Sequence, residues 1–322
     1  MTITLRPYSI DDAKAWDEFC IDALQATFLH TQNFLSYHGN RFVDRSLIVE
    51  EDGKLIGLFP AASIHEADTC VISHPGISYG GVLHRGRLRG ERMLTVMSEI
   101  ACHYRAQGFS QLLYKAVPTI YHRSPSQDDQ YALLRLGAEN TRFDLSSTID
   151  LSNRLPVNQR RRRSFKKALK VGADIVEGSQ NLPAFWNILA YNLQSKHGVK
   201  PVHSIEELIL LAERFPHSIR CISALIDEEV VAGVILFVTP TVCHSQYIAA
   251  NEKGTEHSVL DMVFEHSIGI AIQEKVHWFD FGISTESNGK ILNDGLHGFK
   301  CEFGGGGVVH NFYELDLAKG MA

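Results

Sequence analysis

The order of the predicted elements occurs twice along this chain of 322 residues, and this repetition limits the folds open to it. The first half begins with an alternating strand and a helix, for which Ser9 is a suitable cap. A hairpin then turns at Asp52-Gly53, a pair that tolerates the left-handed backbone of a tight turn. The predicted elements of this half are a strand at 2–8, a helix at 9–24, the hairpin at 46–63, a helix at 91–108, a strand at 109–117, a helix at 126–137 and a strand at 141–151.

The second half has the same order after a basic helix at 156–170. The predicted elements are a strand at 173–178, helices at 182–198 and 204–215, a hairpin at 219–240 that turns at Asp227-Glu228-Glu229, a strand at 243–251, a helix at 258–275, a strand at 277–282, a short helix at 289–299 and a strand at 307–317. Two copies of one order predict an α/β fold of two tandem lobes, each with a mixed, mostly antiparallel sheet flanked by helices. We assign 1–152 to the first lobe and 153–322 to the second.

Composition narrows the class of protein. An apolar fraction of 44% supports a sizeable core, and a net charge of −6 argues against DNA binding through the overall field. The six cysteines lie singly with no C-x-x-C pair, which is typical of reduced thiols. No apolar run approaches the ~18 residues of a membrane span, and the N-terminus lacks a signal-peptide pattern. We therefore predict a globular, cytoplasmic protein, whose oligomeric state the sequence leaves open.

Two catalytic classes are disfavoured by spacing. The stretch at 76–80 matches G-x-S-x-G, but a hydrolase elbow needs a strand directly before its serine and a helix directly after it. The 16 histidines include no H-E-x-x-H and no Cys/His quartet, so we predict no metal site.

The stretch at 279–310 combines a lone lysine, acidic residues and a run of glycines between apolar strands. Attack of an amine on a thioester or ester develops negative charge on the carbonyl oxygen, which a fixed cation stabilises in a dry cleft. Lys300 is the candidate for that cation. The glycines at 304–307 would let the backbone approach a substrate closely. A surface lysine followed by a glycine bulge is the structural alternative.

Three stretches together resemble FemABX-type N-acyltransferases, which use the GNAT acyltransferase fold twice. They are PGISYGGVL at 75–83, RRRRSFKKALKVG at 160–172, and the step from Phe299-Lys300 to Phe303-Gly304. The resemblance covers nearly the whole chain. It implies two GNAT-like lobes with an active-site cleft between them, and transfer of an acyl or aminoacyl group to an amine. The substrate contacts that it implies are Tyr79, Gly80, Phe303 and Gly304.

Three carboxylates of the C-terminal stretch are candidates for the base that accepts the amine proton. Asp280 ends a predicted strand, Glu286 lies in the following loop and Asp294 in the following helix. Orienting two substrates can remove roughly 7–11 kcal/mol of barrier, whereas a base contributes ~10²–10⁴-fold. Positioning should therefore dominate. A helix cap at Asp280 and a solvated side chain at Asp294 are the structural alternatives.

The basic helix contains one misplaced charge. A rotation of 100° per residue puts Arg161 on the apolar side of the helix and Arg162 at its edge, while Arg163 points the other way. A buried charge needs a partner, and a phosphate or carboxylate of the acceptor would supply one. A structural Asp or Glu would supply it equally well.

The turn before the helix at 258–275 is the candidate site for the donor. In single-domain GNAT enzymes this turn holds the pyrophosphate of coenzyme A through backbone N–H groups. Here we assign that role to Asn251, Gly254, Thr255 and Ser258. Glu252 and Glu256 would repel a phosphate, so the sequence departs from the family pattern.

These observations predict a transferase of cell-envelope biosynthesis. It would move an acyl group from acyl-CoA, as co-substrate, to an amino group of a phosphate-bearing envelope or sugar-nucleotide metabolite, by direct attack in a ternary complex. An aminoacyl-tRNA-dependent FemABX-type transferase is the first alternative, and a non-catalytic, ligand-binding GNAT-like protein is the second. The lack of a long helical-hairpin insertion favours coenzyme A, and the basic helix keeps tRNA open.

Overall fold

The computed structural model describes residues 2–319, which form two compact units. Unit 1 contains the residues up to Asp144, Glu286–Ile291 and the residues from Val309 onward. Unit 2 contains Leu145–Thr285 and Leu292–Val308. Strands β9 (Glu139–Asp150) and β17 (Gly306–Asp316) each contribute residues to both units. The lobe boundary at residues 152 and 153 stays a prediction. The compact units differ from it in these two strands and in Glu286–Ile291.

Unit 1 has two groups of strands. The first has the order β1 (Ile3–Pro7), β3 (Leu47–Glu51), β4 (Lys54–Phe59) and β7 (Leu83–His84). The second has the order β17, β8 (Gln111–Lys115), β6 (Cys70–Ile72), β5 (Ala62–Ser63) and β2 (Val43–Asp44). Its helices are α1 (Ala13–Asp22), α2 (Gln32–Leu35), α3 (Glu91–Ala106) and α4 (Asp128–Arg135).

Local chemistry explains the main elements of unit 1. The hairpin of β3 and β4 turns where predicted, with a positive φ of 49° at Asp52 and 74° at Gly53. Helix α3 buries Met93, Val96, Met97 and Ile100 in the core, and their spacing of i, i+3, i+4 and i+7 places them on one helix face.

Unit 2 contains one sheet, whose strands have the order β10, β11, β12, β13, β14 and the second part of β9. The strands are β10 (Asp174–Glu177), β11 (Ile219–Ile226), β12 (Glu229–Val238), β13 (Val242–Ala250) and β14 (Trp278–Ile283). The helices are α5 (Gln159–Lys170), α6 (Leu182–His197), α7 (Ile205–Arg214), α8 (Glu252–Glu256), α9 (Val259–Gln273) and α10 (Asp294–Cys301). The short strands β15 (Thr285–Glu286) and β16 (Ile291–Leu292) lie between β14 and α10 in the sequence.

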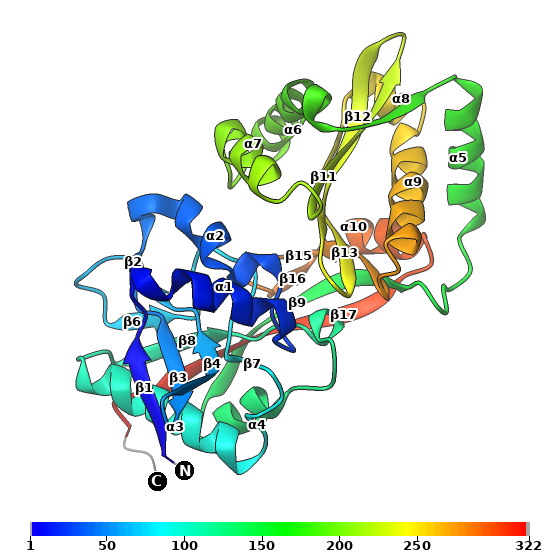
Figure 1. Ribbon diagram of the computed structural model, residues 1–322. Coiled ribbons are helices and arrows are strands. Elements are labelled where there is room, and N and C mark those ends of the chain that lie inside the picture. The colour runs from blue at the N-terminus through cyan, green and yellow to red at the C-terminus, as the bar shows by residue number, and fades with distance from the viewer. Residues whose placement is uncertain (1, 320–322) are drawn as a thin grey trace. The chain divides into compact units, whose positions relative to one another are not determined.

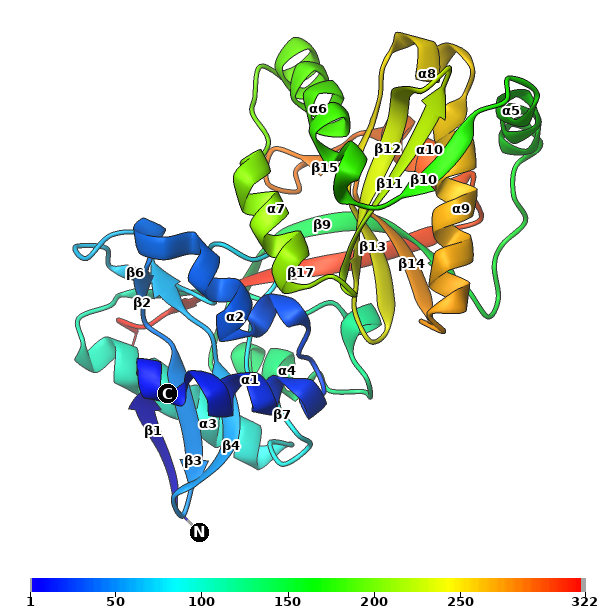
Figure 2. The ribbon, with the colours of Figure 1, turned by 45° about the horizontal axis from the view of Figure 1, so that its top comes forward.

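The sheet of unit 2 has a helix layer on each face. In Figures 1 and 2, α9 and α5 lie on one side of β11–β13, and α6 and α7 lie on the other. Ile222, Val234 and Phe279 belong to the core that contains α9. Because side chains alternate along a strand, the residues next to these point to the opposite face, which we call the α6/α7 face.

One row of residues crosses the α6/α7 face. Ile219 is paired with Phe237, Phe237 with His244, and His244 with Asp280. Side chains that oppose each other in this way share a face and are neighbours. The row therefore runs from the start of β11 across β12 and β13 to β14.

Among the described residues, no helix combines the length and the apolar character that crossing a bilayer requires.

Candidate active site

Strands β13 and β14 are parallel neighbours that pair only over their first three residues. The pairing runs from Val242 opposite Trp278 to His244 opposite Asp280, and within the described residues it stops there. A bulge in β13 follows at once, since Leu236 of β12 pairs with Ser245 while Ile235 pairs with Tyr247. Bulges bend a strand and re-aim its side chains. The end of the paired stretch is thus an opening in the sheet, with His244 and Asp280 at its base.

His244 and Asp280 form a hydrogen-bonded pair. The Nδ1 atom of His244 lies 2.7 Å from Oδ2 of Asp280. The Asp280 side chain is fully buried, and its Oδ1 accepts hydrogen bonds from Ser146 and from Thr148, the latter at 2.8 Å. A carboxylate that accepts from Nδ1 places the imidazole proton there and leaves Nε2 as an acceptor. The His244 side chain is 19% exposed.

Gly282 brings the backbone of β14 beside the His244 ring. Its φ of 79° lies in the left-handed region, and a Cβ at this position would lie 3.2 Å from His244 Cε1. The pairing of β14 with β9 shifts register between Asp280 and Ile283. A side chain at residue 282 would be strained and would crowd the imidazole.

Lys300 fixes this irregular end of β14. Its Nζ donates to the carbonyl oxygens of Gly282 at 2.9 Å and of Ile283 at 2.7 Å. The residue is 4% exposed, and burial lowers its pKa to about 8, while Asp280 acts in the opposite direction. The surface-lysine alternative is therefore wrong. An ammonium has three N–H groups, two of which are used here.

The other two predicted carboxylates have different surroundings. Glu286 is exposed in β15 and belongs to unit 1. Asp294 is exposed in the first turn of α10, which Asn293 caps through a 3.0 Å bond from Leu296 N. Of the three candidates for the base, the structure brings only Asp280 to the opening between β13 and β14.

The predicted donor turn is itself helical. Asn251 caps α8 by accepting from Gly254 N at 2.8 Å, and Thr255 donates back to Asn251 O at 2.8 Å. A Cβ on Gly254 would lie 2.3 Å from Val231 O, so Gly254 packs on β12. Gly254 and Thr255 therefore lie inside a short helix instead of leading into the long one, and Ser258, with a φ of 58°, is the residue before α9.

Arg161 has protein partners. Its Nη1 lies 3.0 Å from both carboxylate oxygens of Asp261, and its Nε lies 3.0 Å from Glu302. Burial raises the pKa of Asp261 to about 6, and Arg161 opposes this shift. The sequence correctly indicated a buried charge in need of a partner, but its contacts are those of the structural alternative. Arg162, the neighbouring candidate, is exposed.

The two residues after Lys300 in the motif have packing roles. Phe303 is fully buried, with ring centroids 5.1 Å from Phe264 and 5.4 Å from Phe281. Burial gives Phe303 a core position in place of the predicted substrate contact. Gly304 has a φ of 92°, and a Cβ there would lie 2.3 Å from Leu155 O. The glycine is thus needed for the close approach of two backbone segments.

Tyr79 and Gly80 lie in a tightly held loop of unit 1. Tyr79 is 4% exposed, with its ring 4.4 Å from that of Tyr121. Gly80 N donates to Lys115 O at 2.8 Å. Lys115 is buried and donates from Nζ to Ile77 O, and burial lowers its pKa to about 7. Substrate contact by Tyr79 and Gly80 stays a prediction.

Sequence reasoning missed His244, Ser146 and Thr148. All three lie in segments that were read only as strands, and strand pairing brings them to Asp280. The available signal was a polar residue at an inward position of an otherwise apolar strand. Among residues 2–319, no group of three or more His, Cys, Asp or Glu side chains is arranged to hold a metal ion.

Residues 157–290 match the family model described as an acetyltransferase (GNAT) domain. This segment contains α5, the strands from β10 to β14 and α9, and so includes the His244–Asp280 pair. The match assigns this segment to the class of GNAT acyltransferase domains, so the chain contains a domain of that class.

Solved structures extend this likeness to nearly the full chain. The crystal structure of FemX is 11% identical, with a TM-score of 0.71 and 97% of each chain covered. A tandem GNAT protein from the clavulanic acid biosynthesis pathway is 10% identical, with a TM-score of 0.53 and coverage of 98% and 99%. L-PGS from Bacillus licheniformis is 12% identical, with a TM-score of 0.59 and coverage of 98% and 94%. The predicted fold of two GNAT-like lobes is confirmed. No curated protein sequence matches the chain.

Proposed function

We propose that this protein transfers an acyl group from acyl-CoA to a primary amine by direct attack in a ternary complex, with His244 as the general base. The observation that carries the proposal is the 2.7 Å bond from His244 to a fully buried carboxylate where β13 and β14 separate. His244 Nε2 would accept the proton that the amine loses as the new C–N bond forms. The C–S bond of the thioester would then break, and coenzyme A would leave as the thiol by taking that proton from the imidazolium. Asp280 would hold the ring in the required tautomer and stabilise the imidazolium that forms.

Lys300 has a supporting part in this proposal. Its two bonds to the carbonyls of Gly282 and Ile283 hold the chain beside the imidazole. The third N–H of its ammonium is the group we assign to the developing oxyanion, because a fixed donor in a water-poor site stabilises charge without reorganisation.

The experiment that tests the base compares His244→Gln and Asp280→Asn with the unchanged protein over a pH series. With His244 as base, His244→Gln loses most of its turnover, and its kcat/KM no longer varies with pH as that of the unchanged protein does. Asp280→Asn should reduce kcat with little change in KM for either substrate, because it acts through the tautomer of His244. An unaltered pH profile in His244→Gln would refute the assignment.

The donor and acceptor are the finer parts of the proposal. Coenzyme A thioesters are the usual donors of GNAT domains, which favours acyl-CoA. Asp261 lies in the first turn of α9 and binds Arg161, which leaves that arginine unavailable to a phosphate. A pyrophosphate at this helix end would therefore be held by backbone N–H groups around Ser258. The phosphate-bearing envelope or sugar-nucleotide acceptor rests on the resemblance to the family and on Arg161. Because Arg161 is bound to Asp261, a phosphate contact would pass to Arg162.

A basic surface favours one alternative donor, an aminoacyl-tRNA. Helix α5 carries seven Lys and Arg residues in a chain of net charge −6. Arg162, Arg163, Lys166 and Lys170 are exposed, and among the described residues no carboxylate pairs with them. Binding of tRNA through these groups would weaken by orders of magnitude between ~50 and ~200 mM salt, whereas acyl-CoA binding through backbone N–H groups would change little. Titration with both ligands over that range separates the donors, and acyl transfer by the purified protein excludes a role limited to ligand binding.

A further inference from the structure

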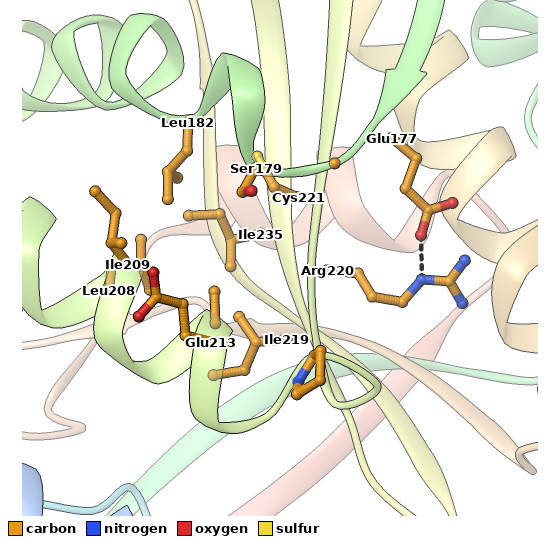
Figure 3. Close-up of a pocket in the computed structure, with 13 residues that line it drawn as sticks. Glu177, Ser179, Leu182, Leu208, Ile209, Glu213, Ile219, Arg220, Cys221 and Ile235 are labelled. Atoms are coloured by element: carbon orange, nitrogen blue, oxygen red, sulfur yellow. Dashed lines mark hydrogen bonds and ion pairs between the residues drawn. The ribbon is translucent and has the colours of Figure 1, made fainter.

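A pocket of about 330 Å³ lies on the α6/α7 face of unit 2. Figure 3 shows aliphatic side chains around one space: Leu208 and Ile209 from α7, Ile219 from β11, Ile235 from β12 and Leu182 from the start of α6. The volume falls at the lower end of the range for small-molecule sites, and an aliphatic lining is typical of them.

The pocket and the His244–Asp280 pair lie on the same face of one sheet. Ile219, in the pocket wall, begins the row that continues through Phe237 to His244 and Asp280. Neighbouring strands are about 4.8 Å apart, so β11 and β13 place Ile219 roughly 10 Å from His244. Phe237, which is 4% exposed, is the residue between them.

The charges at the pocket disfavour an anionic occupant. Figure 3 shows Arg220 directed away from the aliphatic side chains and toward Glu177. Arg220 also donates to Glu274 at 2.7 Å. Its charge is therefore neutralised, and the exposed carboxylate of Glu213 leaves the pocket with an excess of negative charge. A phosphate or a carboxylate would be repelled, whereas an uncharged apolar group would not.

We propose that this pocket binds an apolar group of the amine acceptor, which is attached about 10 Å from the nitrogen that reacts. The inference rests on the proposed function, since His244 marks where that nitrogen must lie. The opening between β13 and β14 lies on the far side of β13 from the pocket. A donor that entered through this opening would approach His244 from the side opposite to the apolar group. The acceptor class is a primary amine with an aliphatic chain or a comparable apolar substituent.

The test uses linear primary alkylamines, from butylamine to decylamine, as probes. Their binding to the full-length protein is measured by calorimetry with free coenzyme A present, so that no turnover occurs. Chains too short to span ~10 Å should bind weakly and alike, and each methylene group that enters the pocket should then lower Kd roughly fourfold.

Two neighbouring residues of α7 give a matched pair of variants. Ile209 and Leu210 are both 38% exposed, but only Ile209 lines the pocket. Ile209→Ala should weaken binding of the longer amines about tenfold, and Leu210→Ala should leave it unchanged. Ala212→Leu adds volume to the pocket wall and should shift the preferred chain length downward. Normal cooperative unfolding of each variant shows that it has folded.

The outcomes separate the pocket from the proposed reaction. A Kd that does not depend on chain length, or equal effects of Ile209→Ala and Leu210→Ala, would overturn the assignment of the pocket. Length-dependent binding sensitive to Ile209, but without acetyl transfer from acetyl-CoA to any bound amine, would refute the acyl-transfer proposal and uphold the pocket as an apolar-ligand site.

Discussion

Both units contain a pair of parallel strands joined through a helix, and the two pairs end differently. In unit 1, α3 lies between β6 and β8 in the sequence, and these two strands pair over three residues. In unit 2, α9 lies between β13 and β14, which also pair over three residues. Beyond the pair in unit 1 the chain stays bonded to β8: Ser73 N donates to Leu113 O at 2.9 Å, and Lys115 N donates to Ser73 Oγ at 2.8 Å. In unit 2 the last residues of the pair, His244 and Asp280, are joined through their side chains.

The difference shows that two units with the same strand order need not both contain a candidate active site. Each unit has a buried lysine that donates to backbone carbonyls near its strand pair, namely Lys115 to Ile77 O and Lys300 to Gly282 O. Of these two lysines, Lys300 is the one that lies near the His244–Asp280 pair, and Asp280 therefore acts on its pKa. In unit 1, Ser73 and Lys115 are bonded to each other and to the neighbouring loop. In unit 2, His244 uses only Nδ1 in its bond to Asp280, which leaves Nε2 as an acceptor.

The largest expected effect separates the histidines at the ends of the two strand pairs. His244→Ala should lower kcat by ~10²–10⁴-fold, the contribution of a general base. His74→Asn is the matched change in unit 1, chosen because His74 has a φ of 58° and asparagine tolerates that backbone. We expect its kcat to stay near that of the unchanged protein in a steady-state assay. Equal losses in both variants would remove the distinction between the units.

The next effect compares the two lysines. Lys300→Met keeps the length of the side chain and removes its charge, and it should lower turnover about 10²-fold, the size of a lost oxyanion contact. Lys115→Met should leave turnover intact in the same assay, since Lys115 serves only the loop of unit 1. Normal turnover in Lys300→Met would exclude this lysine from the mechanism.

A third change sharpens the comparison within unit 2, between a paired and an exposed arginine. Arg161→Gln leaves Asp261 buried without its cation, and the free energy of unfolding at pH 7 should fall by about 3 kcal/mol. Because burial already raises the pKa of Asp261 to about 6, the loss should shrink as the pH falls below that value and the carboxyl is protonated. Arg162→Gln, measured in the same urea titration, should have little effect. A similar small change in both variants would mean that the ion pair is not stabilising.

The smallest effect concerns the pH dependence of stability in unit 1. Burial lowers the pKa of Lys115 to about 7, so between about pH 7 and pH 10 the unfolded chain keeps a proton that the folded chain has lost. The free energy of unfolding should therefore rise with pH over this range. Lys115→Met should reduce the slope, while the contribution of Lys300 remains. If the free energy of unfolding of Lys115→Met had the same slope with pH, Lys115 would carry its proton in both the folded and the unfolded chain over this range.

Much of the fold was predictable because local chemistry decides it. The hairpins turn at Asp52-Gly53 and at Asp227-Glu228, where the sequence predicted them, and both pairs adopt positive φ. The site was less predictable, since it depends on pairing between distant segments. Asp280 was identified from its place at a strand end, but its partner His244 lies 36 residues away, and only the register of β13 and β14 brings the two together.

Arg161 is a second residue whose contacts depend on packing between distant segments and could not be predicted from the sequence. Helical spacing indicated that its charge lies on the buried side and requires a partner, and its side chain is 11% exposed. The identity of the partner depends on how α5 packs on α9, which no local pattern specifies. The resemblance to FemABX-type enzymes implies a substrate contact for the motif residue Phe303, whereas the aromatic cluster around Phe264 buries its ring.

The strands that contribute to both units have a consequence during synthesis. Strand β8 of unit 1 pairs with the end of β17, from Phe312 opposite Lys115 to Asp316 opposite Gln111. A ribosome that has made the first 150 residues has therefore not yet supplied this strand, and at ~5–20 residues per second roughly ten seconds or more pass before it does. During that interval β8 has an unpaired edge, which exposes backbone N–H and C=O groups that can pair with another chain.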